Sequence, residues 1–213
     1  MKRSPASSKL IPFLILVAAV FLWLRDQQPS TKPSPPKNSG GAFERYDSCR
    51  LIDSRGNDGD SFLVRLPDGR EEIFRLYYVD APESAFKTYH NSENNHARIA
   101  DQANDLGGIS PEQAVEIGRR AKKLTHQILN RGFTLHTRWD SPFRDERYHA
   151  FVELDGTPRW LHERLVAKGL ARIHTKPDEL PDGTAVGQQL ARLRELEQSA
   201  KSRGEGAWSF LVR

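Results

Sequence analysis

The residues EIFRLYYVDAPE, at positions 72–83, begin as a run of β-branched and aromatic side chains and end in Asp-Ala-Pro-Glu. The first eight residues are typical of a central β-strand, and Asp and Pro are common where a strand ends. Arg75 is charged but lies inside the apolar part of the run. If it faces inward it needs a partner, either a local carboxylate or the phosphate of a ligand. Alternation along a strand does not by itself bring Arg75 beside Asp80.

Outside this run, short apolar segments alternate with turn signals and indicate four further strands. They lie at residues 48–53, 61–66, 133–139 and 148–154, which makes five strands together with 72–79. Three helices are expected, at residues 110–130, 161–168 and 185–203. The first of them begins with a capping box, with Ser110 as the N-cap and Pro111 as the first helical residue. This order predicts an α+β domain that is mainly a five-stranded β-barrel.

Residues 83–109 show no persistent periodicity of apolar side chains. They are predicted to form a long loop without a regular element. A loop of that length in a compact domain is usually functional or mobile.

The N-terminal part differs in composition from the rest. Residues 10–24 contain no charged side chain and follow a short basic stretch at 1–9, whereas residues 25–41 are rich in Pro, Ser and Gly. We predict a single transmembrane anchor helix, with a signal-peptide core as the alternative, then a disordered linker and a domain at 42–213. The anchor is favoured because no small residues follow the apolar core at positions suited to cleavage. A basic N-terminus is typical of export, which places the domain outside the cytoplasm, either periplasmic or extracellular, and secreted if the segment is cleaved.

The formal net charge of +4 at pH 7 is unevenly distributed. Residues 1–41 hold six basic side chains and one acidic one, and the remaining chain holds 26 basic and 27 acidic ones. Attraction of a polyanion to the domain therefore has to come from locally placed groups rather than from a long-range field. The single cysteine, Cys49, excludes an intramolecular disulfide and zinc sites that need two or more thiolates. We expect a monomeric domain.

Four acidic residues occur where two of the expected strands begin or end. Asp58 and Asp60 precede the strand at 61–66, and Asp80 and Glu83 follow the strand at 72–79. Each pair alone is explained by an ordinary turn, but together the four would repel one another unless a cation binds among them. Oxygen ligands select a hard ion, calcium or magnesium, and a backbone carbonyl such as that of Ala81 suits calcium better.

Five segments resemble, in the same order, the staphylococcal nuclease family, also called thermonucleases. They are DGDSF at 58–62, FRLYYVDAPE at 74–83, Arg147 ahead of AFV at 150–152, LVAKGLARI at 165–173 and GAW at 206–208. The resemblance covers roughly residues 48–209 and implies an OB-fold barrel with three helices. It also implies calcium-dependent hydrolysis of phosphodiester bonds in DNA, RNA or both.

For the metal, the resemblance implies that Asp60 and Asp80 are direct calcium ligands and that the carbonyl oxygen of Ala81 is a third. Asp58 would support these ligands without binding the ion directly. All four residues lie in the segments at 58–62 and 74–83.

For the reaction, the resemblance implies that Glu83 orients or deprotonates the attacking water, while Arg75 and Arg147 hold the scissile phosphate. One divalent cation and two guanidiniums would neutralise the negative charge that grows in the transition state. Arg144 is a weaker alternative to Arg147, because an Asp-Glu pair replaces the Tyr-Gly that precedes the arginine in the family.

The main alternative is a catalytically inactive OB-fold module that binds nucleic acid or protein and is tethered to the membrane. Such modules usually lack the carboxylates or the arginines of the site. Because this chain has all of them, an enzyme is favoured.

The expected helix at 110–130 carries two adjacent pairs of basic residues, Arg119 with Arg120 and Lys122 with Lys123. They form either an ordinary solvated face or a track for nucleic acid. The sequence leaves both interpretations open.

Overall fold

The computed structural model describes residues 41–89, 92–140 and 147–211. The predicted anchor at 10–24, and all but the last residue of the predicted linker at 25–41, lie outside these ranges. Within the ranges, no helix is long and apolar enough to cross a membrane.

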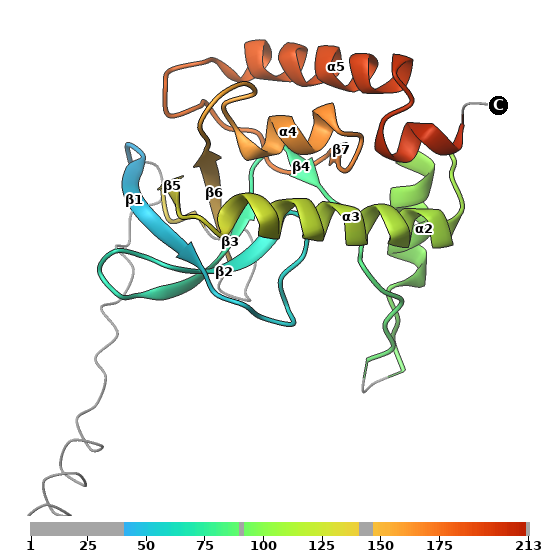
Figure 1. The fold of residues 1–213 in the computed structure, drawn as a ribbon, viewed down its shortest axis with the longest axis horizontal. Helices are drawn as coiled ribbons and strands as arrows, with labels where there is room; N and C mark the ends of the chain where they lie inside the picture. The colour runs from blue at the N-terminus through green and yellow to red at the C-terminus, as the bar shows by residue number, and fades with distance from the viewer. Residues whose placement is uncertain (1–40, 90–91, 141–146, 212–213) are drawn as a thin grey trace, which may run out of the picture. The chain divides into compact units, whose positions relative to one another are not determined.

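Five strands form a closed barrel in the order β1-β2-β3-β6-β5 (Figure 1). They are β1 (Glu44–Leu51), β2 (Ser61–Arg65), β3 (Glu71–Leu76), β5 (Phe133–Thr137) and β6 (Arg147–Glu153). Neighbouring strands are antiparallel except β3 and β6, which run parallel. Alternate side chains fill the interior, among them the fully buried Phe74, Leu135 and Phe151. The predicted α+β fold with a five-stranded, OB-like barrel is therefore confirmed.

The strand predicted at 72–79 is interrupted. β3 ends at Leu76, and a separate strand β4 (Val79–Asp80) pairs with β7 (Arg172–Ile173) in a two-stranded sheet. Between β3 and β4, Tyr78 has a φ angle of 70°, which is uncommon for a bulky side chain. Its ring is fully buried and stacks on the ring of His162, in the helix at Leu161–Ala167. Tertiary packing thus holds a bend that strand propensity alone does not predict.

The described helices are α2 (His96–Asp105), α3 (Pro111–Leu129), α4 (Leu161–Ala167), α5 (Val186–Ser202) and the 3₁₀ turn η1 (Gly206–Phe210). Helix α2 packs against α3, and α4 packs against α5 and β6 (Figure 1). Helix α3 begins as predicted: the Ser110 hydroxyl accepts a hydrogen bond from the Gln113 N–H, and the Gln113 side chain accepts one from the Ser110 N–H.

Helix α2 lies inside the segment predicted to be a long loop, so that prediction is wrong for residues 96–105. Its buried residues are Ile99, Gln102 and Ala103. Only one of these is a large apolar side chain, so the buried side of the helix is small and includes an amide, which a search for apolar residues at helical spacing does not reveal. The described residues therefore form four α-helices, one more than the three that were expected.

Candidate active site

Asp80, on β4, is the centre of a buried network of charged side chains. Its Oδ1 accepts hydrogen bonds from Arg75 Nη2 (2.6 Å) and Arg98 Nη2 (3.1 Å). Its Oδ2 accepts hydrogen bonds from Gln102 Nε2 (2.8 Å) and Arg172 Nε (2.9 Å). Burial opposes ionisation, but the amide hydrogen bond and the three guanidinium charges outweigh it and lower the pKa of Asp80. Asp80 is therefore a carboxylate with ample positive charge around it.

Asp60 is also buried but lies in the opposite electrostatic situation. Its Oδ2 accepts longer hydrogen bonds, from Arg75 Nη2 at 3.3 Å and from the backbone N–H of Ala81 at 3.2 Å. Burial, followed by the negative charge of Asp58, raises the pKa of Asp60 well above its ordinary value, and Arg75 opposes this only in part. Asp60 is thus short of positive charge, which a bound cation would supply.

The loop before β2 holds Asp60 in place through contacts with its own backbone. Asp58 Oδ1 accepts hydrogen bonds from the N–H groups of Asp60 (3.2 Å) and Ser61 (2.9 Å). Gly59 is so closely packed that a Cβ atom there would lie 2.7 Å from the Cβ of Ala81. The DGD motif therefore shapes this loop and seats it against the loop that follows β4.

Arg75 joins the two buried aspartates. On β3 it is paired with Ser61 of β2 and with His149 of β6. One nitrogen, Nη2, lies within hydrogen-bond distance of both Asp60 and Asp80. Of the two kinds of partner considered for Arg75, local carboxylates are those present in the structure. Alternation along a continuous strand could not predict this contact, because the chain brings Asp80 back to Arg75 only by bending out of the barrel where β3 ends.

Glu83 lies at the edge of the cluster and is mostly buried. Its Oε1 is 3.5 Å from Arg98 Nη1, and its backbone N–H donates a hydrogen bond to Gln102 Oε1 (3.0 Å). Helix α3 contacts the same segment, since a Cβ atom on Gly118 would lie 2.5 Å from the carbonyl oxygen of Glu83. Helices α2 and α3 together fix the position of Glu83.

Three residues of the cluster have no role predicted from the sequence: Arg98 and Gln102 of α2, and Arg172 of β7. Gln102 is completely buried, and its Nε2 contacts both Asp80 and the carbonyl oxygen of Ala81 (3.2 Å). It was missed together with its helix, because the buried side of α2 carries only one large apolar residue. Arg172 could have been considered, because it lies in the segment 165–173 that resembles the nuclease family.

Arg147 is the first residue of β6, the strand next to β3. Its Cα is paired with that of Ile73, two residues before the pairing of His149 with Arg75. Because residues two apart on a strand share a face, Arg147 lies on the same face of the sheet as Arg75. The pKa of the His149 side chain is lowered to about 4, mainly by burial and further by the charges of Lys176, Arg75 and Arg147. The structure thus brings both predicted arginines to one face of the barrel.

The cluster opens on a cleft of about 530 Å³. Four cationic side chains line it, Arg75, Arg98, Arg172 and Lys176, against two acidic ones, Asp80 and Asp101. Each of these four cations already forms an ion pair with a carboxylate, so an anionic ligand such as a phosphate would bind there by sharing or replacing those partners. The alternative arginine considered above, Arg144, lies outside the described residues.

The donor atoms available for a metal ion at this cluster are all oxygens. In the described part of the chain, no group of three or more His, Cys, Asp or Glu side chains is arranged to hold a metal ion. Asp60 and Asp80 nevertheless lie close together, because both accept hydrogen bonds from the same nitrogen of Arg75, and a cation shared by the two carboxylates would take the place of that nitrogen. Two carboxylates with the neighbouring carbonyl of Ala81 fit a hard cation whose other ligands come from water or substrate.

The fold and the site together define an OB-like barrel protein with a buried cluster of carboxylates and arginines beside a cationic cleft. The family model described as staphylococcal nuclease homologue matches residues 73–210, well over half of the chain. The chain therefore belongs to the staphylococcal nuclease family, as its motifs predicted. The match includes Arg75, Asp80, Glu83 and Arg147 but begins after Asp60. A comparison with curated proteins gave no significant match.

Proposed function

We propose that this protein is a calcium-dependent nuclease that hydrolyses phosphodiester bonds of DNA, RNA or both. Membership of the staphylococcal nuclease family supports a nuclease and a nucleic-acid partner. The observation that carries the proposal is a pair of buried carboxylates beside a cleft lined by cationic side chains, one of them surrounded by positive charge and the other not. Asp80 is fully compensated by positive charge, whereas Asp60 is not, so the cluster is suited to a cation beside a bound anion.

In this proposal Asp60, Asp80 and the carbonyl oxygen of Ala81 hold the calcium ion, and Asp58 keeps their loop in shape. Bound calcium would supply positive charge close to the phosphate oxygen that becomes more negative during hydrolysis. The oxygen-only donor set supports calcium or magnesium over softer metals. Calcium is preferred because the ligands come from an irregular loop and include a backbone carbonyl.

The remaining roles belong to side chains on the cleft and at its edge. Arg75 and Arg147 would bind phosphate oxygens, because guanidinium groups form paired, charge-assisted hydrogen bonds with phosphates. Glu83 would orient a water molecule and accept its proton, a function for which a carboxylate must be held in a fixed position. Contacts from Arg98, Gln102 and helix α3 meet that requirement.

We further propose that residues 10–24 anchor the protein in a membrane and that the domain acts outside the cytoplasm as a monomer. The support is the uncharged apolar segment between a basic N-terminus and a Pro-rich linker. A protease-protection experiment on intact cells tests it, because an external domain is digested while a cytoplasmic one survives.

A second candidate function is a noncatalytic binding module, tethered in the same way. It is favoured by one observation: both oxygens of Asp80 already accept hydrogen bonds from buried or half-buried arginines. In a purely structural role, such a network would fix the loops of the barrel without any metal ion.

Incubation of the full-length chain with single- and double-stranded DNA and RNA distinguishes the two functions. Cleavage is measured with calcium, with magnesium and with excess chelator. We expect calcium-dependent cleavage that falls by at least about 100-fold in Glu83→Gln. The matched control is Glu116→Gln, on the exposed side of α3, which should cleave like the wild type. Full activity in chelator would exclude the metal, and no cleavage with any cation would favour the binding module.

A further inference from the structure

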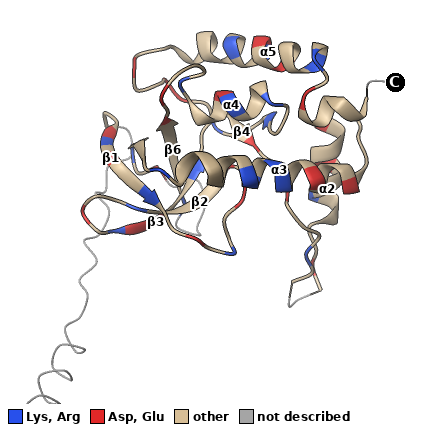
Figure 2. Ribbon diagram, in the orientation of Figure 1, with Lys and Arg blue, Asp and Glu red and all other residues tan. Residues whose placement is uncertain are grey.

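The exposed side of helix α3 has an unusual arrangement of charge. Its first half carries Glu112 and Glu116, and the rest of the helix and the turn after it carry five basic residues (Figure 2). These are Arg119, Arg120, Lys122, Lys123 and Arg131, named here the α3 basic surface. Positions 119, 122 and 123 follow the i, i+3, i+4 spacing that places side chains on one side of a helix. All but Lys122 are exposed.

The α3 basic surface has no acidic partners among the residues that the structure describes, since no ion pair there involves any of its five members. Some other exposed arginines of the domain do have such partners, for example Arg65 with Glu71 at 2.7 Å and Arg159 with Glu153 at 2.6 Å. The α3 basic surface differs from isolated exposed arginines because its cations without such partners are grouped on one helix. The domain contains slightly more acidic than basic side chains. Its acidic groups are therefore available but are placed elsewhere.

The helix dipole does not account for this arrangement. Cations near a helix C-terminus are stabilised by the dipole, but the effect is confined to about the last turn. Arg119 and Arg120 lie well before the last turn of α3, which ends at Leu129. Positive charge in the middle of the helix therefore has no such local explanation.

The α3 basic surface is continuous with the candidate active site. Arg119 Nε donates a hydrogen bond to the carbonyl oxygen of Ser84, the residue after Glu83. On the other side of the helix axis, the Thr125 hydroxyl donates a hydrogen bond to the carbonyl oxygen of Gly59 in the DGD motif (2.8 Å). A shallow hollow of about 510 Å³ lies along Ser84, Arg119 and the two lysines. The α3 basic surface thus adjoins the segment that carries Glu83.

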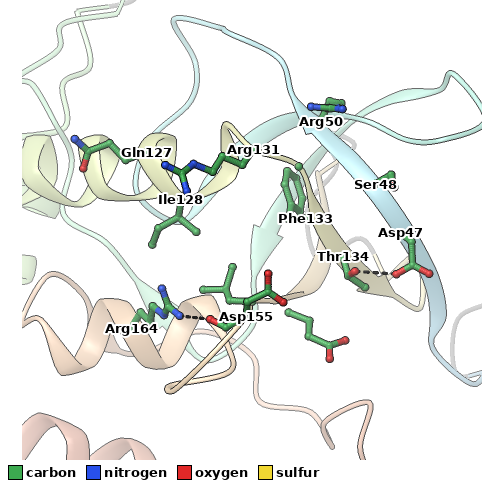
Figure 3. Close-up of a pocket in the computed structure, with 13 residues that line it drawn as sticks. Asp47, Ser48, Arg50, Gln127, Ile128, Arg131, Phe133, Thr134, Asp155 and Arg164 are labelled. Atoms are coloured by element: carbon green, nitrogen blue, oxygen red, sulfur yellow. Dashed lines mark hydrogen bonds between the residues drawn. The ribbon is translucent and has the colours of Figure 1, made fainter.

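At its far end the α3 basic surface reaches a second pocket, of about 630 Å³, shown in Figure 3. Arg131 after α3 and Arg50 of β1 both line this pocket, and neither has an ion-pair partner among the described residues. Gln127 and Thr134 add polar groups to its wall. Three acidic residues, Asp47, Glu153 and Asp155, also line this pocket, and the first two form ion pairs with Arg45 and Arg159. Arg50 and Arg131 thus place two cations without a described ion-pair partner beyond the end of the helix, in a pocket whose lining is balanced in charge.

We propose that the α3 basic surface, extended by Arg50, binds the phosphate backbone of the nucleic acid that enters the candidate active site. This inference rests on the proposed function and adds a path for the substrate. At 1.5 Å per residue, the distance from Arg119 to Arg131 is about 18 Å. One strand of a duplex, with a phosphate about every 3.4 Å along the helix axis, presents about five phosphates over that distance. Duplex substrates of only two or three base pairs would not reach the far end.

The test measures binding without cleavage, in a Glu83→Gln background with chelator, so that it does not depend on catalysis. The probe is a fluorescent 20-nucleotide single strand, and Kd is measured at several salt concentrations. Each lost phosphate contact should reduce the slope of log K against log salt by about 0.7. The variant Lys122→Gln/Lys123→Gln should therefore lose about 1.4 from the slope and bind less tightly at low salt.

The matched control is Arg192→Gln/Arg194→Gln, an exposed pair on α5 that is remote in sequence from both motifs. It should keep the slope of the background protein. Equal slopes and Kd values for both double variants would overturn the proposal.

A second experiment measures binding to vesicles of phosphatidylcholine and phosphatidylserine. If the α3 variant loses vesicle binding but keeps nucleic-acid binding, the surface contacts lipid and the proposal is wrong. If binding is lost as expected but no cation supports cleavage, the proposed function fails and this inference stands.

Discussion

A single methyl group added at Gly118 of α3 should displace the loop that carries Glu83 in the candidate active site. Gly118 lies on the buried side of α3, directly under the loop that carries Glu83. A Cβ atom there would lie 2.4 Å from the carbonyl oxygen of Pro82 and 2.5 Å from that of Glu83. Both atoms belong to the backbone, so no side-chain rotation can relieve the contact.

The size of the effect follows from these distances. They are about 1 Å shorter than an ordinary van der Waals contact, so the loop has to move by about that amount. Overpacking of this kind lowers the unfolding free energy by about 1–3 kcal/mol, whereas replacing glycine by alanine inside a helix raises it by about 1 kcal/mol. We therefore expect Gly118→Ala to lose at most about 2 kcal/mol of unfolding free energy. A displacement of about 1 Å in a catalytic group costs about 100-fold in rate, so activity should fall much more than stability.

The assay compares Gly118→Ala with Gly187→Ala in calcium-dependent cleavage and in urea unfolding. Gly187 lies in α5, and a Cβ atom there has no neighbour within 4 Å, so this control gains helix propensity without a clash. It should be as active as the wild type and at least as stable. If Gly118→Ala matched the control in both measurements, α3 would not set the position of Glu83.

Two further predictions concern buried ionisable groups. Asp80→Asn should lower the unfolding free energy by about 3–5 kcal/mol at pH 7 in chelator, because buried guanidiniums lose their counter-ion. Asp60→Asn should not lower the unfolding free energy, because burial and neighbouring carboxylates already oppose the charge of Asp60. Urea unfolding of both variants measures the difference. Equal losses in the two variants would contradict this prediction. Burial lowers the pKa of His149 to about 4 and that of His162 to about 3, so the unfolded chain binds their protons first as the pH falls below 6.5. Stability should therefore decrease from pH 6.5 to pH 4, as measured by Tm, and the decrease should be smaller in His162→Gln; an unchanged profile would show that His162 is not the source.

Features encoded by neighbouring residues could be predicted from the sequence. The capping box at Ser110 predicts the start of α3, and α4 ends close to the expected bound at residue 168, just before Gly169 with its φ angle of 60°. The two loops that carry Asp60 and Asp80 were also recognised, because their turn residues and carboxylates are contiguous.

Features that depend on distant packing could not be predicted. The bend at Tyr78 needs a φ angle that tyrosine disfavours, and only the surrounding core holds it. The contribution of Gln102 was missed because a polar residue on the buried side of a short helix looks like a residue of a solvated loop. Without the bend and this helix, Asp80 is not predicted to contact Arg75.

The pairing of β4 with β7 also determines when the site can form. Arg172 contacts Asp80 across 92 positions of the chain, so the charge balance of Asp80 depends on residues near the end of the domain. A nascent or truncated chain that lacks residue 172 holds the DGD and VDAPE motifs but only two of the three arginines that contact Asp80. In the nuclease proposed above, this order of assembly would delay completion of the site until most of the domain has been synthesised.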